Sequence, residues 1–415
     1  MDNTRIDPHR LWASLMEMAK LGATPKGGVH RLALDDDDWA ARDLLVQWCR
    51  EAGCSVRVDK MGNIFARRPG RSQGAAPVMA GSHLDSQPTG GKFDGALGVM
   101  AALEVIRTLN DLRLDTECPV ELVCWTNEEG SRFPPAMLGS GVFTGVFQLG
   151  RGLGIADQDG RTVGEELKRI GYSGPEDVGG IDVDSYFEVH IEQGPILEAE
   201  GADIGVVTGA VGQRWYDVTL TGQEAHAGPT PMDMRRDALL GACEVIDAVN
   251  RSAVEYGPDA RATVGYMRVY PNSRNVVPGR VTFSVDLRHP DDNELARMDS
   301  VLSEICLKVL RERKLELGLH QLFHFPPTNF DGECVGLVRE AAERSGYSVR
   351  DVVSGAGHDA IYMQRVAPSA LIFVPCEGGV SHNEAENISL EVASAGCQTL
   401  FNAVLGRANR ERRAA

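Results

Sequence analysis

The chain has 415 residues, more than a single hydrophobic core usually supports, so two domains are expected. Hydrophobic residues make up 43% and charged residues 24%, as in ordinary soluble proteins, and a net charge of −17 argues against nucleic-acid and anionic-membrane partners. No stretch approaches the roughly 20 apolar residues that span a bilayer. The start MDNTRIDPHRLW lacks the apolar core of a signal peptide, and the cysteines form no C-x-x-C pair. We therefore expect a cytoplasmic protein.

The N-terminal part of the chain is predicted to form an α/β domain. The first 50 residues are expected to be helical, because DDDDWAARDLLVQWCREAG places acidic residues before apolar ones at helical spacing. Next come VMAGSH (78–83) as a strand, GALGVMAALEVIRTLNDL (95–112) as a helix and PVELVCWTNEEG (119–130) as a buried strand ending in acids. This order predicts a mixed, largely parallel sheet flanked by helices, in which ligands bind beyond the carboxyl ends of the strands.

The pattern changes near Gly212. Strand patterns at 214–222, 262–269, 279–289 and 315–325 alternate with helical patterns at 235–253 and 291–313. The order β-α-β-β-α-β is the ferredoxin-like arrangement. We therefore expect residues 213–328 to form a second domain, inserted between 1–212 and 329–415, which form the first. APSALIFVP (367–375) predicts another buried strand of that first domain.

Four segments place histidines or carboxylates beside glycine or proline, near predicted strand ends. Taken singly, each has an ordinary explanation: a histidine after a strand is usually a hydrogen-bonded structural residue, and a Glu-Glu pair is usually solvated. Together they supply the ligand types that two adjacent divalent ions need when one carboxylate bridges them, and a further carboxylate can act as general base. The residues are His83 and Asp94, the pair Glu128–Glu129, His190 and His382. Asp94 also precedes a helix, where the dipole and capping favour aspartate.

Seven motifs, in order from about residue 80 to 390, resemble the hydantoinase/carbamoylase family of amidohydrolases, within the M20-type metallopeptidase superfamily. They are GSHLDSQPTGGKFDG, WTNEEGSRFPPAMLGSGVF, HIEQGPILE, GQEAHAGPTPMDMRRDA, NSRNVVPGRVTFSVDLRH, SGAGHDA and GGVSHNEAE. The resemblance implies a di-metal aminopeptidase-like catalytic domain carrying a ferredoxin-like lid and dimerisation domain. Because family members are typically homodimers, it also implies a homodimer.

The resemblance further implies roles for individual residues. His83 and His190 would hold one metal ion, Glu129 and His382 a second, and Asp94 would bridge the two. The two ions per subunit would be Zn²⁺, with Mn²⁺, Co²⁺ or Ni²⁺ as alternatives. Glu128 would be the catalytic acid and base. The residues that would contact the substrate are Gln193, His226, Asn275 and Arg288. His226 would also stabilise the oxyanion.

Two residues near these positions have open roles. Asp85 could orient the imidazole of His83 through a hydrogen bond, or it could cap a turn. His358, in SGAGHDA, is expected near the site but has no assigned role.

The family comprises N-carbamoyl-L-amino-acid hydrolases, β-ureidopropionases and allantoate amidohydrolases. We expect hydrolysis of an N-carbamoyl amino acid, either N-carbamoyl-β-alanine or an N-carbamoyl-L-α-amino acid, to the amino acid, ammonia and carbon dioxide. Allantoate enzymes carry two consecutive arginines where this chain has Arg214–Trp215, which suits a substrate with one ureido arm. A metallo-exopeptidase is a second alternative, although many such relatives have a carboxylate at the position of His190. A non-catalytic binding protein is a third, which the complete ligand set disfavours.

Overall fold

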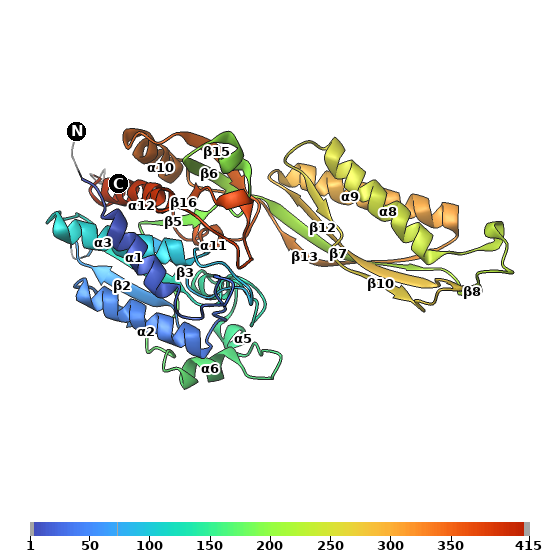
Figure 1. Ribbon diagram of the computed structural model, residues 1–415, viewed down its shortest axis with the longest axis horizontal. Coiled ribbons are helices and arrows are strands. Elements are labelled where there is room, and N and C mark those ends of the chain that lie inside the picture. The colour runs from blue at the N-terminus through green and yellow to red at the C-terminus, as the bar shows by residue number, and fades with distance from the viewer. Residues whose placement is uncertain (1–3, 73, 411–415) are drawn as a thin grey trace. The chain divides into compact units, whose positions relative to one another are not determined.

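A computed structural model describes residues 4–72 and 74–410, and the chain divides into two units (Figure 1). The first unit runs to Thr208 and resumes at Phe330, and the second spans Gly209–Asn329. These bounds lie within a few residues of 213 and 328, where the sequence pattern changes.

The first unit is built on one mixed sheet in the order β1-β2-β4-β3-β5-β16-β6, and β15 also pairs with β6. The four central strands β4, β3, β5 and β16 are parallel, and every residue in them is buried. Burial of successive residues, which point to opposite faces, is typical of parallel strands covered by helices on both faces, and confirms the expected α/β class. The strand bounds are β1 Ser55–Val58, β2 Ile64–Arg68, β3 Val78–His83, β4 Val120–Trp125, β5 Ser185–Ile191, β6 Ile204–Ala210, β15 Val349–Ser354 and β16 Ser369–Val374.

Helices cover this sheet. Helices α3 and α12 pack against β3 and β5, α1 packs on both helices, and α11 packs against β5 and β16. The expected N-terminal helices are present as α1 and α2, and Asp35 caps α2 by accepting the N–H of Asp38. The helix bounds are α1 Pro8–Met18, α2 Asp36–Glu51, α3 Ala96–Asp111, α4 Leu138–Phe143, α5 Leu149–Leu153, α6 Val163–Arg169, α7 Ile196–Glu200, α10 Gly332–Arg344, α11 Asp359–Met363, η2 Glu377–Gly379 and α12 Leu390–Ala408.

The expected capping role of Asp94 is wrong. The N-cap of α3 is Gly95, at φ +65°, and no side chain caps this helix. A Cβ at residue 95 would lie 2.4–2.5 Å from the ring of His83, so glycine is required where the chain passes this imidazole. The carboxylate of Asp94 is thereby directed toward His83 and His190 instead of the helix end.

The second unit is a sheet in the order β10-β12-β7-β13, with β9 also paired to β12, and α8 and α9 pack on it (Figure 1). All of these strand pairs are antiparallel, as in the ferredoxin-like arrangement. The bounds are β7 Gly212–Thr221, β8 Ala225–His226, η1 Met232–Met234, α8 Ala238–Glu255, β9 Arg261–Thr263, β10 Met267–Tyr270, β11 Val276–Val277, β12 Arg280–His289, α9 Asp292–Arg313, β13 Glu316–Phe325 and β14 Thr328–Asn329.

One expected strand of this unit is interrupted. Residues 262–269 form two short strands, β9 and β10, which pair with successive parts of β12. Gly265 lies in the gap, and glycine weakens strand structure. Beside it, the N–H of Tyr266 donates to the side-chain hydroxyl of Ser284 in place of a backbone carbonyl. Across the part of the chain that the structure describes, no helix is both long enough and apolar enough to cross a membrane.

Candidate metal centre

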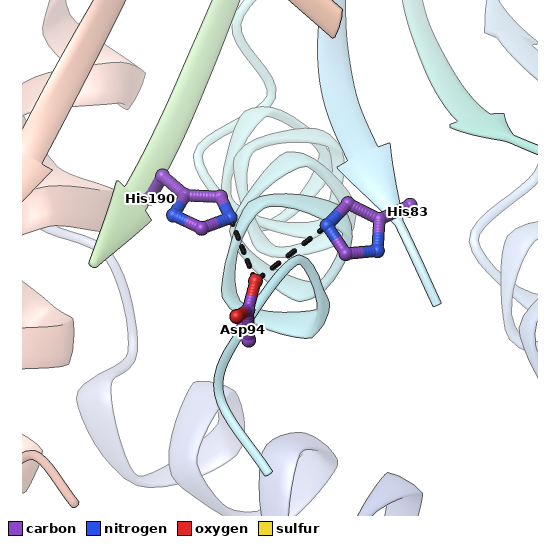
Figure 2. A group of neighbouring side chains, drawn as sticks. All are labelled: His83, Asp94 and His190. Atoms are coloured by element: carbon purple, nitrogen blue, oxygen red, sulfur yellow. Dashed lines mark ion pairs between the residues drawn. The ribbon is translucent and has the colours of Figure 1, made fainter. Parts of the chain in front are cut away.

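The first group of potential ligands lies at the carboxyl ends of two paired strands. His83 is the last residue of β3, His190 lies near the end of its neighbour β5, and Asp94 lies in the loop before α3. Figure 2 shows the two imidazoles facing the carboxylate from either side. Oδ1 of Asp94 is 3.1 Å from Nε2 of His190 and 3.6 Å from Nε2 of His83. All three residues are buried, and their donor atoms lie close enough together to hold one ion.

Backbone carbonyls orient both imidazoles. Nδ1 of His83 lies 2.8 Å from the carbonyl oxygen of Asp85, and Nδ1 of His190 lies 2.9 Å from that of Ile191. Since a carbonyl can only accept, each Nδ1 carries the hydrogen and each Nε2 is directed at Asp94. Burial lowers the pKa of His83 to about 4. Burial also lowers the pKa of His190, but its hydrogen bond to Asp94, the charges of Asp94 and Glu188 and the bond to Ile191 together outweigh burial and raise the pKa to about 9.

A second group shares Asp94 with the first. Oδ2 of Asp94 is 3.6 Å from Nε2 of His382, which is 3.3 Å from Oε2 of Glu129. Asp94 thus presents one oxygen to each group, which is the arrangement of a bridging carboxylate. Within residues 4–72 and 74–410, these two groups are the ones whose donor atoms approach closely enough for an ion. Imidazole and carboxylate donors suit Zn²⁺, Mn²⁺, Co²⁺ and Ni²⁺, so the residues present fit such ions.

Glu128 and Glu129 follow the end of β4, beyond Asn127 at φ +58°. Oε2 of Glu128 lies 3.5 Å from Nε2 of His83, in the first group. Oε2 of Glu129 accepts a 2.7 Å hydrogen bond from Gln87 and faces His382, in the second group. Burial, then the charges of Asp359 and Glu129, raise the pKa of Glu128 well above its usual range. Neighbouring carboxylates therefore occupy different parts of the centre.

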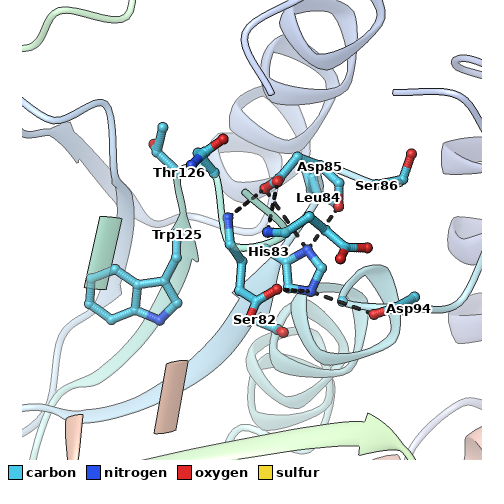
Figure 3. Close-up of polar contacts among 12 residues, drawn as sticks. Ser82, His83, Leu84, Asp85, Ser86, Asp94, Trp125 and Thr126 are labelled. Carbon is cyan, nitrogen blue, oxygen red and sulfur yellow. Dashed lines mark hydrogen bonds and ion pairs between the residues drawn. The ribbon is translucent and has the colours of Figure 1, made fainter. Parts of the chain in front are cut away.

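Asp85 uses both its backbone and its side chain (Figure 3). Its carbonyl oxygen, not its carboxylate, orients His83. Its carboxylate is 3.9 Å from Nδ1 of His83 and accepts the backbone N–H groups of Glu128 and Glu129, each at 3.1 Å. Burial, with the charge of Asp38, raises the pKa of Asp85 to about 7. The residue therefore holds the peptide that carries both glutamates, a role that neither expected alternative described.

Gln193 lies inside the second group. Its Nε2 donates to Oδ2 of Asp94 at 2.8 Å and lies 3.4 Å from Nε2 of His382. Its backbone has φ +57°, and its side-chain oxygen is buried without a hydrogen-bond partner among the described residues. An unpaired amide oxygen at this place is suited to accept a hydrogen bond from a bound molecule.

Buried polar residues whose roles the sequence did not assign lie around His190. The ring of His358 packs edge-on against His190, with centroids 4.5 Å apart, and its buried Nε2 has no partner among the described residues. Its neighbour Asp359 accepts a hydrogen bond from Ser140. Glu188, two residues before His190, accepts bonds from Ser82 at 2.6 Å and from the N–H of Ala360 at 3.0 Å. The motif SGAGHDA signalled this region, but nothing marked Glu188.

The other expected substrate residues lie in the second unit. His226 of β8 pairs with Val276 of β11, and the N–H of Ala227 donates to the carbonyl oxygen of Asn275 at 2.9 Å, so His226 and Asn275 lie near each other. Arg288 lies on β12 and donates to the carboxylate of Asp286 from Nε and Nη2, at 2.8–3.2 Å.

Comparison with known proteins assigns the family. Peptidase family M20/M25/M40 matches residues 79–406. An N-carbamoyl-L-amino-acid amidohydrolase of Rhizobium meliloti is 51% identical over 97% of each chain. A solved amidase of the hydantoinase/carbamoylase family from Burkholderia multivorans is 60% identical with a TM-score of 0.96, and the match covers 99% of this chain and 100% of the other. This chain belongs to the hydantoinase/carbamoylase amidohydrolases of the M20 superfamily.

More distant members of the family carry another activity in their names. An allantoate amidohydrolase of Bacillus subtilis is 35% identical over 92% of this chain and 93% of its own length. The resemblance of this chain to the hydantoinase/carbamoylase family is thus confirmed. This chain carries the candidate metal ligands described above.

Proposed function

We propose that this protein hydrolyses N-carbamoyl-L-amino acids to the free amino acid, ammonia and carbon dioxide. The observation that carries this is the position of Asp94, which presents one carboxylate oxygen to each of two ligand groups beside the buried Glu128. The identity of 51% to an N-carbamoyl-L-amino-acid amidohydrolase supports the L-α-amino acid as the product.

Two divalent ions are proposed to bind the centre. His83 and His190 would hold one, Glu129 and His382 the other, and Asp94 would contact both. When bound, such ions supply an acidified water and positive charge close to the substrate carbonyl. A ureido carbonyl needs this help because two nitrogens donate electrons into it and make it a poor electrophile.

Glu128 is the proposed proton carrier. Its carboxylate lies beside the first ligand group, 3.5 Å from Nε2 of His83, but belongs to neither set of ligands. It would take a proton from the attacking water and return it to the leaving nitrogen as the C–N bond breaks. General acid–base transfer of this kind is worth about 10²- to 10⁴-fold in rate.

Arg288, Asn275 and His226 of the second unit, with Gln193 of the first unit, are proposed to hold the substrate. Arg288 would grip the substrate carboxylate, because a guanidinium donates two parallel hydrogen bonds. Asn275 and Gln193 would make further polar contacts, and His226 would donate to the developing oxyanion. A donor in that position is worth ~3–4 kcal/mol. The second unit would thus act as a lid, and we propose that it also joins two subunits as a homodimer.

A substrate panel tests this function. Purified protein supplied with Mn²⁺ or Zn²⁺ is offered N-carbamoyl-L-amino acids, N-carbamoyl-β-alanine, allantoate and dipeptides, and released ammonia or amino acid is measured. We expect the highest kcat/KM on N-carbamoyl-L-amino acids. Preference for allantoate or N-carbamoyl-β-alanine would assign another activity of the family, and cleavage of dipeptides alone would assign an exopeptidase.

A further inference from the structure

Glu386 connects the two ligand groups through hydrogen bonds. The residue is only 2% exposed, and its Oε1 accepts the backbone N–H groups of Phe93 at 3.0 Å and Asp94 at 3.1 Å. The hydroxyl of Ser381 lies 3.2 Å from Oε2 of Glu386 and 3.2 Å from Oδ2 of Asp94. One buried side chain therefore ties the peptide of Asp94 to the loop that carries His382.

The loop of Asp94 is shaped to admit this carboxylate. A Cβ at Gly91 would lie 2.0–2.3 Å from the carboxyl carbon and both carboxyl oxygens of Glu386. Contacts that short are impossible, so any other residue at position 91 would displace the carboxylate or the loop. The close approach of Glu386 to the 93–94 peptide thus depends on a glycine two residues away.

The two ligand groups are supported differently. His83 and His190 lie on paired strands of the central sheet, and Asp94 leads directly into α3. His382 instead lies in the irregular segment between β16 and α12, with φ +51° and a side chain that is 51% exposed. The sheet therefore holds the first group, whereas the second group depends on how its loop is anchored.

We propose that Glu386 is a positioning residue that fixes Oδ2 of Asp94 relative to His382 and so sets the affinity of the second cation position. The inference rests on the proposed two-ion centre. It requires that a side chain as long as that of glutamate accepts the backbone N–H groups of Phe93 and Asp94. It does not require Glu386 to contact an ion or the substrate.

Three substitutions of Glu386 and one of Gly91 separate geometry from charge. Glu386→Ala removes the acceptor, and Glu386→Asp keeps the charge but shortens the reach. Glu386→Gln keeps the length, because its amide oxygen can accept both N–H groups while its NH₂ donates to the hydroxyl of Ser381. Gly91→Ala leaves Glu386 in place but blocks its approach. Glu391→Ala is the matched control, since Glu391 is an exposed glutamate in the first turn of α12.

The test measures Mn²⁺ bound per chain by equilibrium dialysis and the electron paramagnetic resonance of the bound ions. The unchanged protein, Glu391→Ala and Glu386→Gln should bind two ions that give a spin-coupled signal. Glu386→Ala, Glu386→Asp and Gly91→Ala should keep the first ion, with the signal of an isolated Mn²⁺. Their affinity for the second ion should fall about 10- to 100-fold, as for other residues that orient metal ligands.

The outcomes distinguish this inference from the proposed function. If the unchanged protein binds fewer than two ions, the two-ion centre itself is wrong. If it binds two and Glu386→Ala also binds two with unchanged affinity, the role of Glu386 is overturned. Equal loss of both ions, together with a lowered melting temperature, would show general destabilisation and overturn it too. If Glu386→Gln bound the second ion as weakly as Glu386→Ala does, positioning by hydrogen bonds would be contradicted.

Discussion

The carboxylate of Asp85 accepts the backbone N–H of Glu128 at 3.1 Å, although the two residues are 43 positions apart in the chain. The same carboxylate accepts the N–H of Glu129, and the carbonyl oxygen of Asp85 orients His83. Asp85, which follows β3, therefore sets the positions of the proposed ligands His83 and Glu129 and of the proposed proton carrier Glu128. Asp85 and Glu386 act alike, since each accepts two successive N–H groups of a peptide that carries site residues.

Replacing Asp85 should loosen the centre. Each carboxylate oxygen of Asp85 accepts one backbone N–H. In Asp85→Asn, an NH₂ group replaces one of these oxygens, so one buried backbone N–H loses its acceptor, which destabilises the fold by ~1–3 kcal/mol. We expect a lower melting temperature and an affinity for divalent ions reduced about 10- to 100-fold. Asp182→Asn, at an exposed position, is the control. Unchanged ion affinity in Asp85→Asn would show that the 128–129 peptide keeps its place without the clamp.

The neighbours Glu128 and Glu129 should have separable effects. Glu128→Gln should lower kcat by about 10²- to 10⁴-fold, the usual worth of a general acid–base group, while the protein still binds two ions. Glu129→Gln should weaken binding of the second ion, because a ligand is lost. Parallel measurements of kcat and bound ions on both variants check this. Near-normal turnover in Glu128→Gln would remove it from the proposed role.

Arg288 should recognise the substrate carboxylate. Arg288→Lys keeps the charge but loses the paired donors, and a hydrogen bond to a charged group contributes ~1.5–3 kcal/mol, so kcat/KM should fall roughly 10- to 100-fold. The same variant should barely change the rate on an N-carbamoyl amino-acid amide, which has no carboxylate. An equal loss on both compounds would mean that Arg288 affects the fold of the second unit instead.

Removal of divalent ions should affect stability as well as activity. Chelation should abolish ammonia release, and adding Zn²⁺, Mn²⁺ or Co²⁺ should restore it. The proposed ligands come from β3, β5 and three loops, so they lie together only in the folded chain. An ion that binds them therefore stabilises the folded chain over the unfolded one. At 100 times its Kd, one ion adds about 2.7 kcal/mol. Calorimetry with and without chelator should therefore show a raised melting temperature in the loaded protein, and an unchanged one would contradict a centre at these residues.

Local sequence patterns predicted the elements that carry the site. VMAGSH forms β3 with the expected bounds, and 95–112 contains α3, because a short apolar run between polar residues fits a buried strand and a longer stripe of apolar residues at helical spacing fits a helix. The break between β9 and β10 was missed, since one glycine within an otherwise apolar stretch is a weak signal.

Long-range hydrogen bonds could not be predicted. The motifs identified residues that the structure brings together, among them His83, Asp94 and His190. The partners of the Asp85 and Glu386 carboxylates are peptides 43 and 292 positions away, and no local pattern encodes such pairings. The helix cap assigned to Asp94 failed for the same reason, because its side chain faces groups from β3 and β5.

A two-ion centre bridged by Asp94 is proposed to hydrolyse N-carbamoyl-L-amino acids. The most direct test is to titrate the ion-free protein with Zn²⁺ or Mn²⁺ and follow ammonia released from an N-carbamoyl-L-amino acid against ions bound per chain. We predict no ammonia without ions and a rise that reaches its plateau at two bound ions per chain. Full activity without ions, or no ammonia at any loading, would contradict the account.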